Sequence, residues 1–278
     1  MAEPGLIEFE LVVLLAAVGA GAFGAVVGVG GGLILVPLLT GFLGVDIKLA
    51  IAASLLGVIA VSTTASTTYL ARGWADRRLG LVLLVATASG GILGGYLAGL
   101  LDGRVLAGIF SVVLLVVAGQ MARRRVDRPP PETLPGRFEF DSAYLEPTTG
   151  TEVRYRVGRV PLGGAISVGA GALSGLLGIG GGVVNVPTMN ALMGVPIRVA
   201  TSTSTYMLGA TAVASAVLYY SRGEVDGLLA APVVVGVLVG ARVGARLAAH
   251  LPRRALQLAF ALVALVFAAQ MLMRGMAG

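Results

Sequence analysis

The sequence predicts an all-α polytopic membrane protein built from two inverted repeats, each with a Gly-broken helical hairpin and three further transmembrane helices. Three observations predict this fold: an apolar composition, a duplicated glycine motif, and basic loops that exchange ends between the two halves. The mean hydropathy is +0.92, and charged residues make up 12% of the chain. Soluble domains carry about 25% charged residues. The chain is therefore expected in the plasma (inner) membrane of the cell as a multi-pass protein.

Most of the chain consists of apolar runs that are long enough to cross a bilayer, which takes about 20 residues in a helix. These runs lie near 6–27, 49–71, 79–101, 104–122, 161–178, 199–221, 228–249 and 255–273. Two shorter apolar pieces, near 33–44 and 183–195, follow the glycine clusters. Each half thus offers one long and one short helix joined by a break, and then three long helices.

One sequence motif occurs twice. Gly28-Val-Gly-Gly-Gly-Leu-Ile-Leu-Val-Pro37 recurs 150 residues later as Gly178-Ile-Gly-Gly-Gly-Val-Val-Asn-Val-Pro187, and the match extends without a gap from 19–73 to 169–223. Self-similarity at a fixed offset indicates duplication of one structural unit. We assign residues 1–122 to the first transmembrane repeat, 123–160 to a cytoplasmic linker, and 161–278 to the second repeat.

The linker assignment rests on arginine. Residues 122–160 hold eight arginines and three consecutive prolines, and loops rich in Lys and Arg stay in the cytoplasm. Counting spans backwards places the 72–78 loop on the same side, and it carries three arginines. The equivalent 222–226 loop is net acidic, so charge predicts the opposite orientation for it. The two repeats are therefore expected to be inverted, with both termini outside.

The linker also contains two segments of alternating polar and apolar residues. Phe138–Asp141 and Glu152–Val157 flank a Pro147-Thr-Thr-Gly150 stretch, which indicates a β-hairpin. We interpret it as a solvated connector. A regulatory or docking element is the alternative.

The glycine motif predicts a binding site. Consecutive glycines allow positive φ angles and let another group approach the backbone closely, and irregular backbone at membrane depth must be buried or line a wet cavity. The free N–H groups of the two short helices would point at an anion near the bilayer midplane. The candidate substrate-binding glycines are Gly30, Gly31, Gly32, Gly180, Gly181 and Gly182. Close helix packing is the alternative interpretation of these glycines, and it is the one adopted for Gly90–Gly95, Gly99, Gly236, Gly240 and Gly244.

Several polar residues near the motif are further candidates. Asn185 and Asn190 replace Leu35 and Thr40 of the first repeat, so the second repeat should contact substrate more. Ser202, Thr203, Ser204 and Thr205 begin a span, where their hydroxyls either line a cavity or bond to their own helix. Arg242 lies inside a span and is the one basic candidate for an anion contact.

The composition also excludes functions. The chain has no cysteine and a single histidine, so no metal site, redox centre or cofactor is expected. All acidic residues are expected in loops or at the termini, which argues against an intramembrane proton relay. The net charge of +6 is explained by arginines at cytoplasmic helix ends, and no nucleic-acid partner is expected.

With its doubled GxGGGxxxVP motif, the sequence resembles the TauE/SafE sulfite exporter family, also called the toluene sulfonate uptake permease family. The resemblance implies a permease for sulfite, organosulfonates or related oxyanions. We therefore expect a membrane transporter of small sulfur-containing anions and not an enzyme. An anion channel, or a permease for carboxylates or other oxyanions, is the alternative. The expected partners are the small anionic substrate, the lipid bilayer and a second copy in a homodimer.

Overall fold

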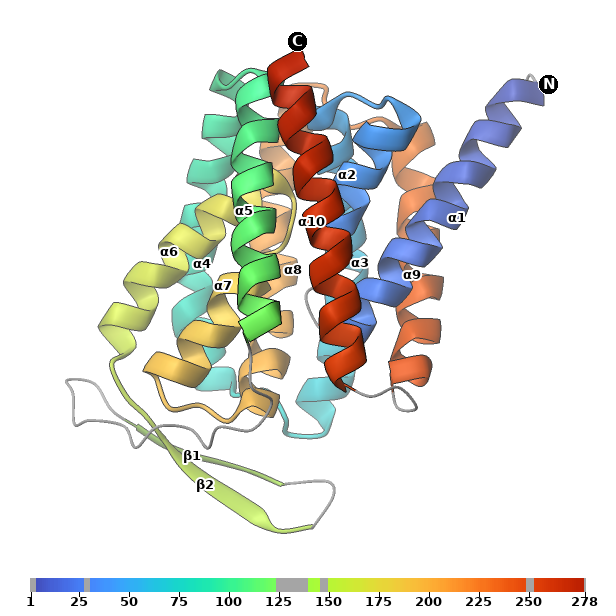
Figure 1. The fold of residues 1–278 in the computed structure, drawn as a ribbon. Helices are drawn as coiled ribbons and strands as arrows, with labels where there is room; N and C mark the ends of the chain where they lie inside the picture. The colour runs from blue at the N-terminus through green and yellow to red at the C-terminus, as the bar shows by residue number, and fades with distance from the viewer. Residues whose placement is uncertain (1–3, 28–30, 124–139, 146–149, 249–252, 278) are drawn as a thin grey trace.

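The computed structural model describes residues 4–27, 31–123, 140–145, 150–248 and 253–277, and in these parts the chain is a bundle of helices with one short hairpin (Figure 1). In chain order, the elements are α1 (Pro4–Val27), α2 (Gly32–Leu43), α3 (Ile47–Ala71), α4 (Arg77–Leu100), α5 (Gly103–Arg123), β1 (Phe140–Leu145), β2 (Glu152–Val157), α6 (Val160–Leu177), α7 (Gly182–Pro187), the π-helical turn η1 (Thr188–Leu192), α8 (Ile197–Ser221), α9 (Gly227–Ala248) and α10 (Arg253–Ala277). The predicted all-α membrane fold is confirmed.

Among the described residues, six helices are long and apolar enough to cross a membrane: α1, α3, α4, α5, α6 and α9. The long helices α8 and α10, which the sequence also predicts as spans, are not among them. The helix α8 contains the polar Thr201–Thr205 run, which lowers its apolar content. It nevertheless packs between α3 and α4 in the centre of the bundle, where polar side chains meet protein and not lipid.

The duplication is visible in the helix boundaries. The helices α3 and α8 start at Ile47 and Ile197 and end just before Arg72 and Arg222, at the same offset of 150. The pairs α4 and α9, and α5 and α10, start with the same offset. The short helix α2 matches α7 together with η1. Pro187 immediately precedes η1, and a proline within a helix removes one backbone hydrogen bond.

The two repeats interlock. The helix α1 of the first repeat packs on α9 of the second, and α6 of the second packs on α4 of the first. The equivalent helices α3 and α8 pack on one another, as do α5 and α10. Every one of these contacts therefore crosses from one repeat to the other, so the two repeats do not form separate hydrophobic cores.

Glycines make the crossed contacts possible. A Cβ atom on Gly240 or Gly244 would collide with the backbone of α1 at Val18 or Ala22. On α4, Gly90 and Gly94 lie equally close to the backbone of α6. Small residues allow membrane helices to approach until their backbones touch. The packing interpretation of these glycines is confirmed.

The two ends of the bundle differ. Figure 1 shows both chain termini at one end, which we call the terminal end, and β1 and β2 at the other, which we call the hairpin end. The helix α1 begins at the terminal end, whereas its equivalent α6 begins at the hairpin end (Figure 1). Opposite directions are what inverted repeats require, and the orientation in a membrane stays a prediction.

The linker forms the predicted hairpin, with β1 and β2 antiparallel. The second strand, Glu152–Val157, matches the predicted range, whereas the first is Phe140–Leu145; Phe138 and Glu139 lie outside the described residues. The interpretation as a solvated connector is wrong. Tyr144 and Val157 are buried in a hydrophobic cluster with Leu79 of α4 and Met189 of η1, so the hairpin is docked on the bundle.

Candidate functional site

The two glycine breaks touch. A Cβ atom on Gly32, the first residue of α2, would collide with the carbonyl oxygen of Gly178 and lie 2.7 Å from the hydroxyl of Ser54. The same hydroxyl donates a hydrogen bond of 2.8 Å to the Gly178 carbonyl. Gly32 and Ser54 belong to the first repeat and Gly178 to the second, so the contact joins the two breaks across the centre of the molecule. Gly30 lies outside the described residues.

The second break depends on glycine conformation. Gly178 has a φ of 66° and Gly180 a φ of 65°, values that residues with a Cβ atom rarely adopt. Gly178 ends α6, and Gly181 precedes the first residue of α7. Among the described residues, the amides of Gly181, Gly182 and Val183 meet no backbone acceptor. The break therefore presents N–H groups to whatever occupies it.

Unpaired polar side chains surround this break. Asn185 Oδ1, Ser204 Oγ and Ser174 Oγ are buried, and none has a hydrogen-bond partner in the described part of the chain. All three residues are at most 1% exposed. A buried polar atom without a partner costs about 1–3 kcal/mol, so native proteins rarely leave one unless water or a ligand completes it.

Two of these side chains lie against the glycines. Asn185 Nδ2 is 3.2 Å from where a Cβ atom on Gly181 would stand, and Ser204 Oγ is 3.4 Å from the same point on Gly182. Ser174 lies in the last turn of α6, where its carbonyl accepts the N–H of Gly178. Backbone amides, the Asn185 side chain and the Ser204 hydroxyl thus lie together at the buried second break.

The first break is chemically different. The equivalents of Asn185 and Ser174 are Leu35 and Gly24, and Ser54, the equivalent of Ser204, already donates to Gly178. Gly31 and Gly32 are buried here, and Ile34 and Leu35 donate their amides to the Gly31 carbonyl. The surroundings of the first break are therefore apolar. The first break supports the second by packing against it, and Ser54 adds the hydrogen bond to the Gly178 carbonyl.

The predicted polar run does not act as one group. Only Ser204 is both unpaired and next to a glycine break. Thr203 Oγ1 accepts the amide of Asp76 at 2.9 Å, which fixes the loop before α4. Thr205 donates to the carbonyl of Thr201 within its own helix, and its carbonyl accepts the hydroxyl of Ser62. Ser202 is buried on the same helix.

Two predicted site residues lie elsewhere. Asn190 Nδ2 donates to the carbonyl of Val195 at 2.9 Å, which closes the turn after η1. Arg242 is exposed on α9 and is not enclosed together with the breaks. Ser54 and Ser174 were not predicted as site residues from the sequence. Ser54 could have been found from the sequence, because it and Ser204 are the same residue type at the 150-residue offset. No such signal marks Ser174, because its equivalent in the first repeat is a glycine.

The expectation that all acids lie in loops or at the termini needs a correction, because Glu8 and Glu10 near the N-terminus lie in the helix α1 and within its candidate span. Asp76 is a loop residue, as expected, but it is only 6% exposed. Its Oδ1 accepts the amide of Leu79 at 3.1 Å and its Oδ2 accepts the hydroxyl of Tyr155 at 2.8 Å. Both carboxylate oxygens are thus engaged in structural hydrogen bonds. In the described part of the chain, no group of three or more His, Cys, Asp or Glu side chains stands ready to hold a metal ion.

Interlocked helical repeats joined at broken helices, with a buried polar break, define a polytopic membrane protein of the transporter class. The chain belongs to the sulfite exporter TauE/SafE family, whose model matches residues 13–271. A curated relative, the probable membrane transporter protein YunE of Bacillus subtilis (strain 168), is 26% identical over 278 residues, which cover 96% of this chain and 98% of the relative. No solved structure gives a significant match. The chain is a multi-pass transporter of the plasma membrane.

Proposed function

We propose that the protein transports small sulfur-containing oxyanions, such as sulfite or an organosulfonate, and binds them at the second glycine break. The family description supports the substrate class. The observation that carries the binding site is the buried pair Asn185 and Ser204, whose Oδ1 and Oγ atoms lack partners and whose side chains lie beside Gly181 and Gly182. An anion with several oxygens accepts hydrogen bonds from the free amides, from Ser204 and from the Asn185 side-chain amide.

The proposed site attracts an anion without a formal positive charge. In the described part of the chain, no carboxylate touches the break, and oriented N–H groups supply partial positive charge. Because the site is buried, these dipoles act in a low dielectric and are stronger than in water. Neutral recognition of this kind binds an anion without holding it as tightly as an arginine pair would, which suits a carrier that must also release its substrate.

The test uses the difference between the repeats. Asn185→Leu installs the residue of the first repeat, and Ser204→Ala removes the unpaired hydroxyl. Because neither side chain has a partner to lose, each variant should unfold at the same temperature as the parent or higher. Each should nevertheless bind sulfite and sulfoacetate at least about tenfold more weakly, which corresponds to about 1.4 kcal/mol, in a calorimetric titration of purified protein.

Ser54→Ala is the matched control. It removes a serine at the equivalent position whose hydroxyl bonds the Gly178 carbonyl, so it should lower the unfolding temperature. If Asn185→Leu and Ser204→Ala instead destabilise the protein and leave anion affinity unchanged, the two side chains are structural and the proposed site is wrong.

Flux measurements on the purified protein distinguish a carrier from an anion channel and a sulfonate permease from a carboxylate permease. In proteoliposomes a carrier saturates with substrate and shows counterflow, whereas the flux through an anion channel follows the electrochemical gradient. Stronger binding of acetate than of sulfite or sulfoacetate would favour a carboxylate permease.

A further inference from the structure

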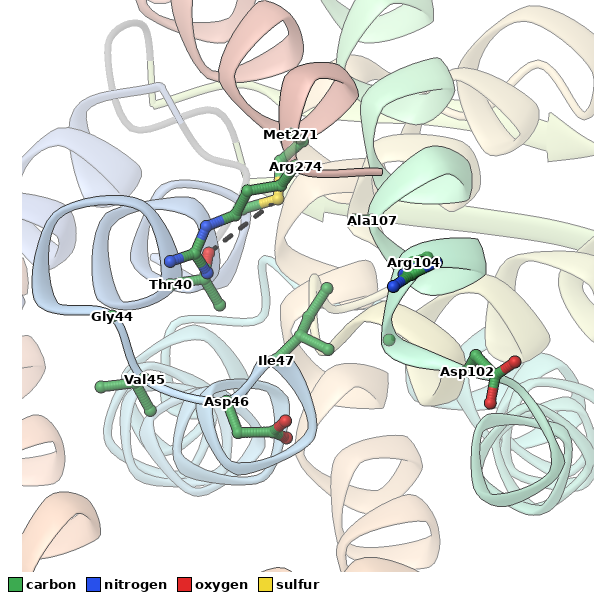
Figure 2. A pocket seen from close by; sticks show the side chains of 11 residues that line it. Thr40, Gly44, Val45, Asp46, Ile47, Asp102, Arg104, Ala107, Met271 and Arg274 are labelled. Atoms are coloured by element: carbon green, nitrogen blue, oxygen red, sulfur yellow. Dashed lines mark hydrogen bonds between the residues drawn. The ribbon is translucent and has the colours of Figure 1, made fainter. Parts of the chain in front are cut away.

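A polar cavity lies at the terminal end, away from the glycine breaks. It has a volume of about 680 Å³ and is lined by the end of α2, the loop to α3, the start of α5 and the end of α10. Figure 2 shows its charged side chains: Arg274 reaches from α10 over Thr40, Arg104 projects from α5, and Asp46 and Asp102 lie at other edges.

The two arginines come from equivalent helices that the fold brings together. Gly275 lies close to α5, and a Cβ atom there would be 3.4 Å from the backbone oxygen of Arg104. The pairing of α5 with α10 therefore brings Arg104 and Arg274 into the lining of the same cavity. Two like charges in one cavity repel each other. The presence of both arginines in this cavity therefore suggests that an anion binds between them.

Neither arginine has an ion-pair or hydrogen-bond partner in the described part of the chain. The other cations near this end are engaged: Arg222 pairs with Glu224 at 2.8 Å, and Lys48 Nζ lies 3.5 Å from the Gly99 carbonyl. Asp46 and Asp102 line the same cavity but form no salt bridge with Arg104 or Arg274. Asp46 instead accepts the amide of Lys48 at 2.8 Å, as the cap of α3.

The cavity lies at one end of the helix that leads to the site. The helix α2 begins at the first glycine break with Gly32, and Thr40 in its last turns forms part of the cavity lining. Twelve residues of α-helix span about 18 Å. Thr40 is fully buried, so the cavity ends against the part of α2 that is packed inside the bundle.

We propose that this cavity is a vestibule in which Arg104 and Arg274 collect the transported oxyanion before it moves along α2 to the break. The inference rests on the proposed function. Guanidinium groups bind the oxygens of small oxyanions through paired N–H donors. Because the cavity is open, binding there is weak and salt-dependent, and Asp46 and Asp102 oppose it.

Flux assays that distinguish the two sides of the protein test the vestibule. Protein is reconstituted in one orientation, and sulfoacetate uptake is measured separately from each side. Arg104→Gln and Arg274→Gln should each raise the half-saturating concentration about twofold to fivefold for uptake from the terminal end. Uptake from the hairpin end should remain unchanged. The effect should decrease at high ionic strength, because salt screens exposed charges.

Removing charges of opposite sign excludes a structural explanation. Asp102→Asn removes a repelling charge and should lower the half-saturating concentration from the same side. Arg77→Gln, an exposed arginine at the hairpin end, is the control that should not affect uptake from the terminal end. A loss of folding would not change the apparent affinity in opposite directions for arginine and aspartate variants.

A binding assay that needs no transport completes the test. The protein has no cysteine, so Val45→Cys in the cavity wall is its single thiol. Sulfoacetate should slow the reaction of this thiol with a neutral maleimide, and the protection should be lost when both arginines are glutamine. The vestibule alone is overturned if wild-type flux saturates, sulfoacetate does not protect the thiol, and the arginine variants keep the parental half-saturating concentration. Absence of sulfite and sulfoacetate flux in the parent overturns the proposed function.

Discussion

The hydroxyl of Tyr155 donates a 2.8 Å hydrogen bond to Oδ2 of Asp76. Tyr155 belongs to the linker hairpin, and Asp76 caps the start of α4 in the first repeat through the amide of Leu79. The amide of Asp76 in turn bonds Thr203 of α8 in the second repeat. The hairpin is therefore attached at the point where the α3–α4 loop meets α8, and it ties the linker to both repeats.

Removing the Tyr155 hydroxyl should loosen the hairpin. In Tyr155→Phe, Asp76 loses one partner for a buried carboxylate oxygen. A hydrogen bond to a charged group contributes about 1.5–3 kcal/mol, and partial exposure puts the expected loss near the lower value. Limited proteolysis within the hairpin should become faster, and the unfolding temperature should fall. Tyr220→Phe, an exposed tyrosine at the terminal end, should change neither, and equal protease sensitivity of all three proteins would contradict the docking contact.

The hydrogen bond between Tyr155 and Asp76 should keep the hairpin docked throughout the physiological pH range. Burial raises the pKa of Tyr155 above its ordinary value, so the folded protein favours the neutral phenol. Stability from this effect is fully present below the unfolded pKa of about 10 and is lost as the pH rises through the higher folded value. Hairpin protection from protease should thus be constant between about pH 6 and about pH 9. Release of the hairpin near neutral pH would show that another group controls docking.

The inverted orientation can be tested at two equivalent positions. Arg77 and Gly227 are the first residues of α4 and α9, both are exposed, and the chain has no native cysteine. A Cβ atom on Gly227 meets nothing within 4 Å. In intact cells, a membrane-impermeant maleimide should label Gly227→Cys and should label Arg77→Cys only after permeabilisation. Labelling of both from the same side would show parallel repeats.

Gly181→Val should abolish transport while the protein still inserts. A Cβ atom there would be 3.1 Å from the carbonyl of Ala170 and 3.2 Å from Asn185 Nδ2, so the larger side chain would displace Asn185 and fill the break. Gly169→Val is the matched control, because Gly169 has nothing within 4 Å. Flux of sulfite should be lost in the first variant and retained in the second. Parental flux in a well-expressed Gly181→Val protein would exclude a substrate site at this glycine.

Transport of a permanently ionised sulfonate should depend little on pH. The buried Asp76 uses both carboxylate oxygens in structural hydrogen bonds, and the exposed Asp226 caps α9 through the amide of Leu228. Neither is placed to carry a proton through the membrane. Sulfite flux should instead follow the ionisation of sulfite itself. A steep sigmoidal profile for ethanesulfonate flux, abolished by Asp226→Asn, would reveal a titrating acid in the pathway.

The sequence determined the repeated architecture because its signals are local or periodic. Apolar runs of bilayer length predicted the helices, and the motif Gly28–Pro37 with its copy Gly178–Pro187 predicted the breaks. Alternating polar and apolar residues predicted the second strand, Glu152–Val157. The second repeat was also predicted to be the more polar one from Asn185 and Asn190, which replace Leu35 and Thr40. These features depend on residue type and spacing along the chain, which the sequence states directly.

Only the tertiary structure decided which polar groups lack partners. Thr203, Ser204 and Thr205 are adjacent in sequence, yet they lie on different faces of α8 and meet a loop, a glycine break and their own helix. The docked hairpin and the cavity between α5 and α10 also depend on contacts between distant segments. The reason is physical: hydrogen bonding and burial are properties of a side chain's three-dimensional neighbours, and residues far apart in sequence supply most of them.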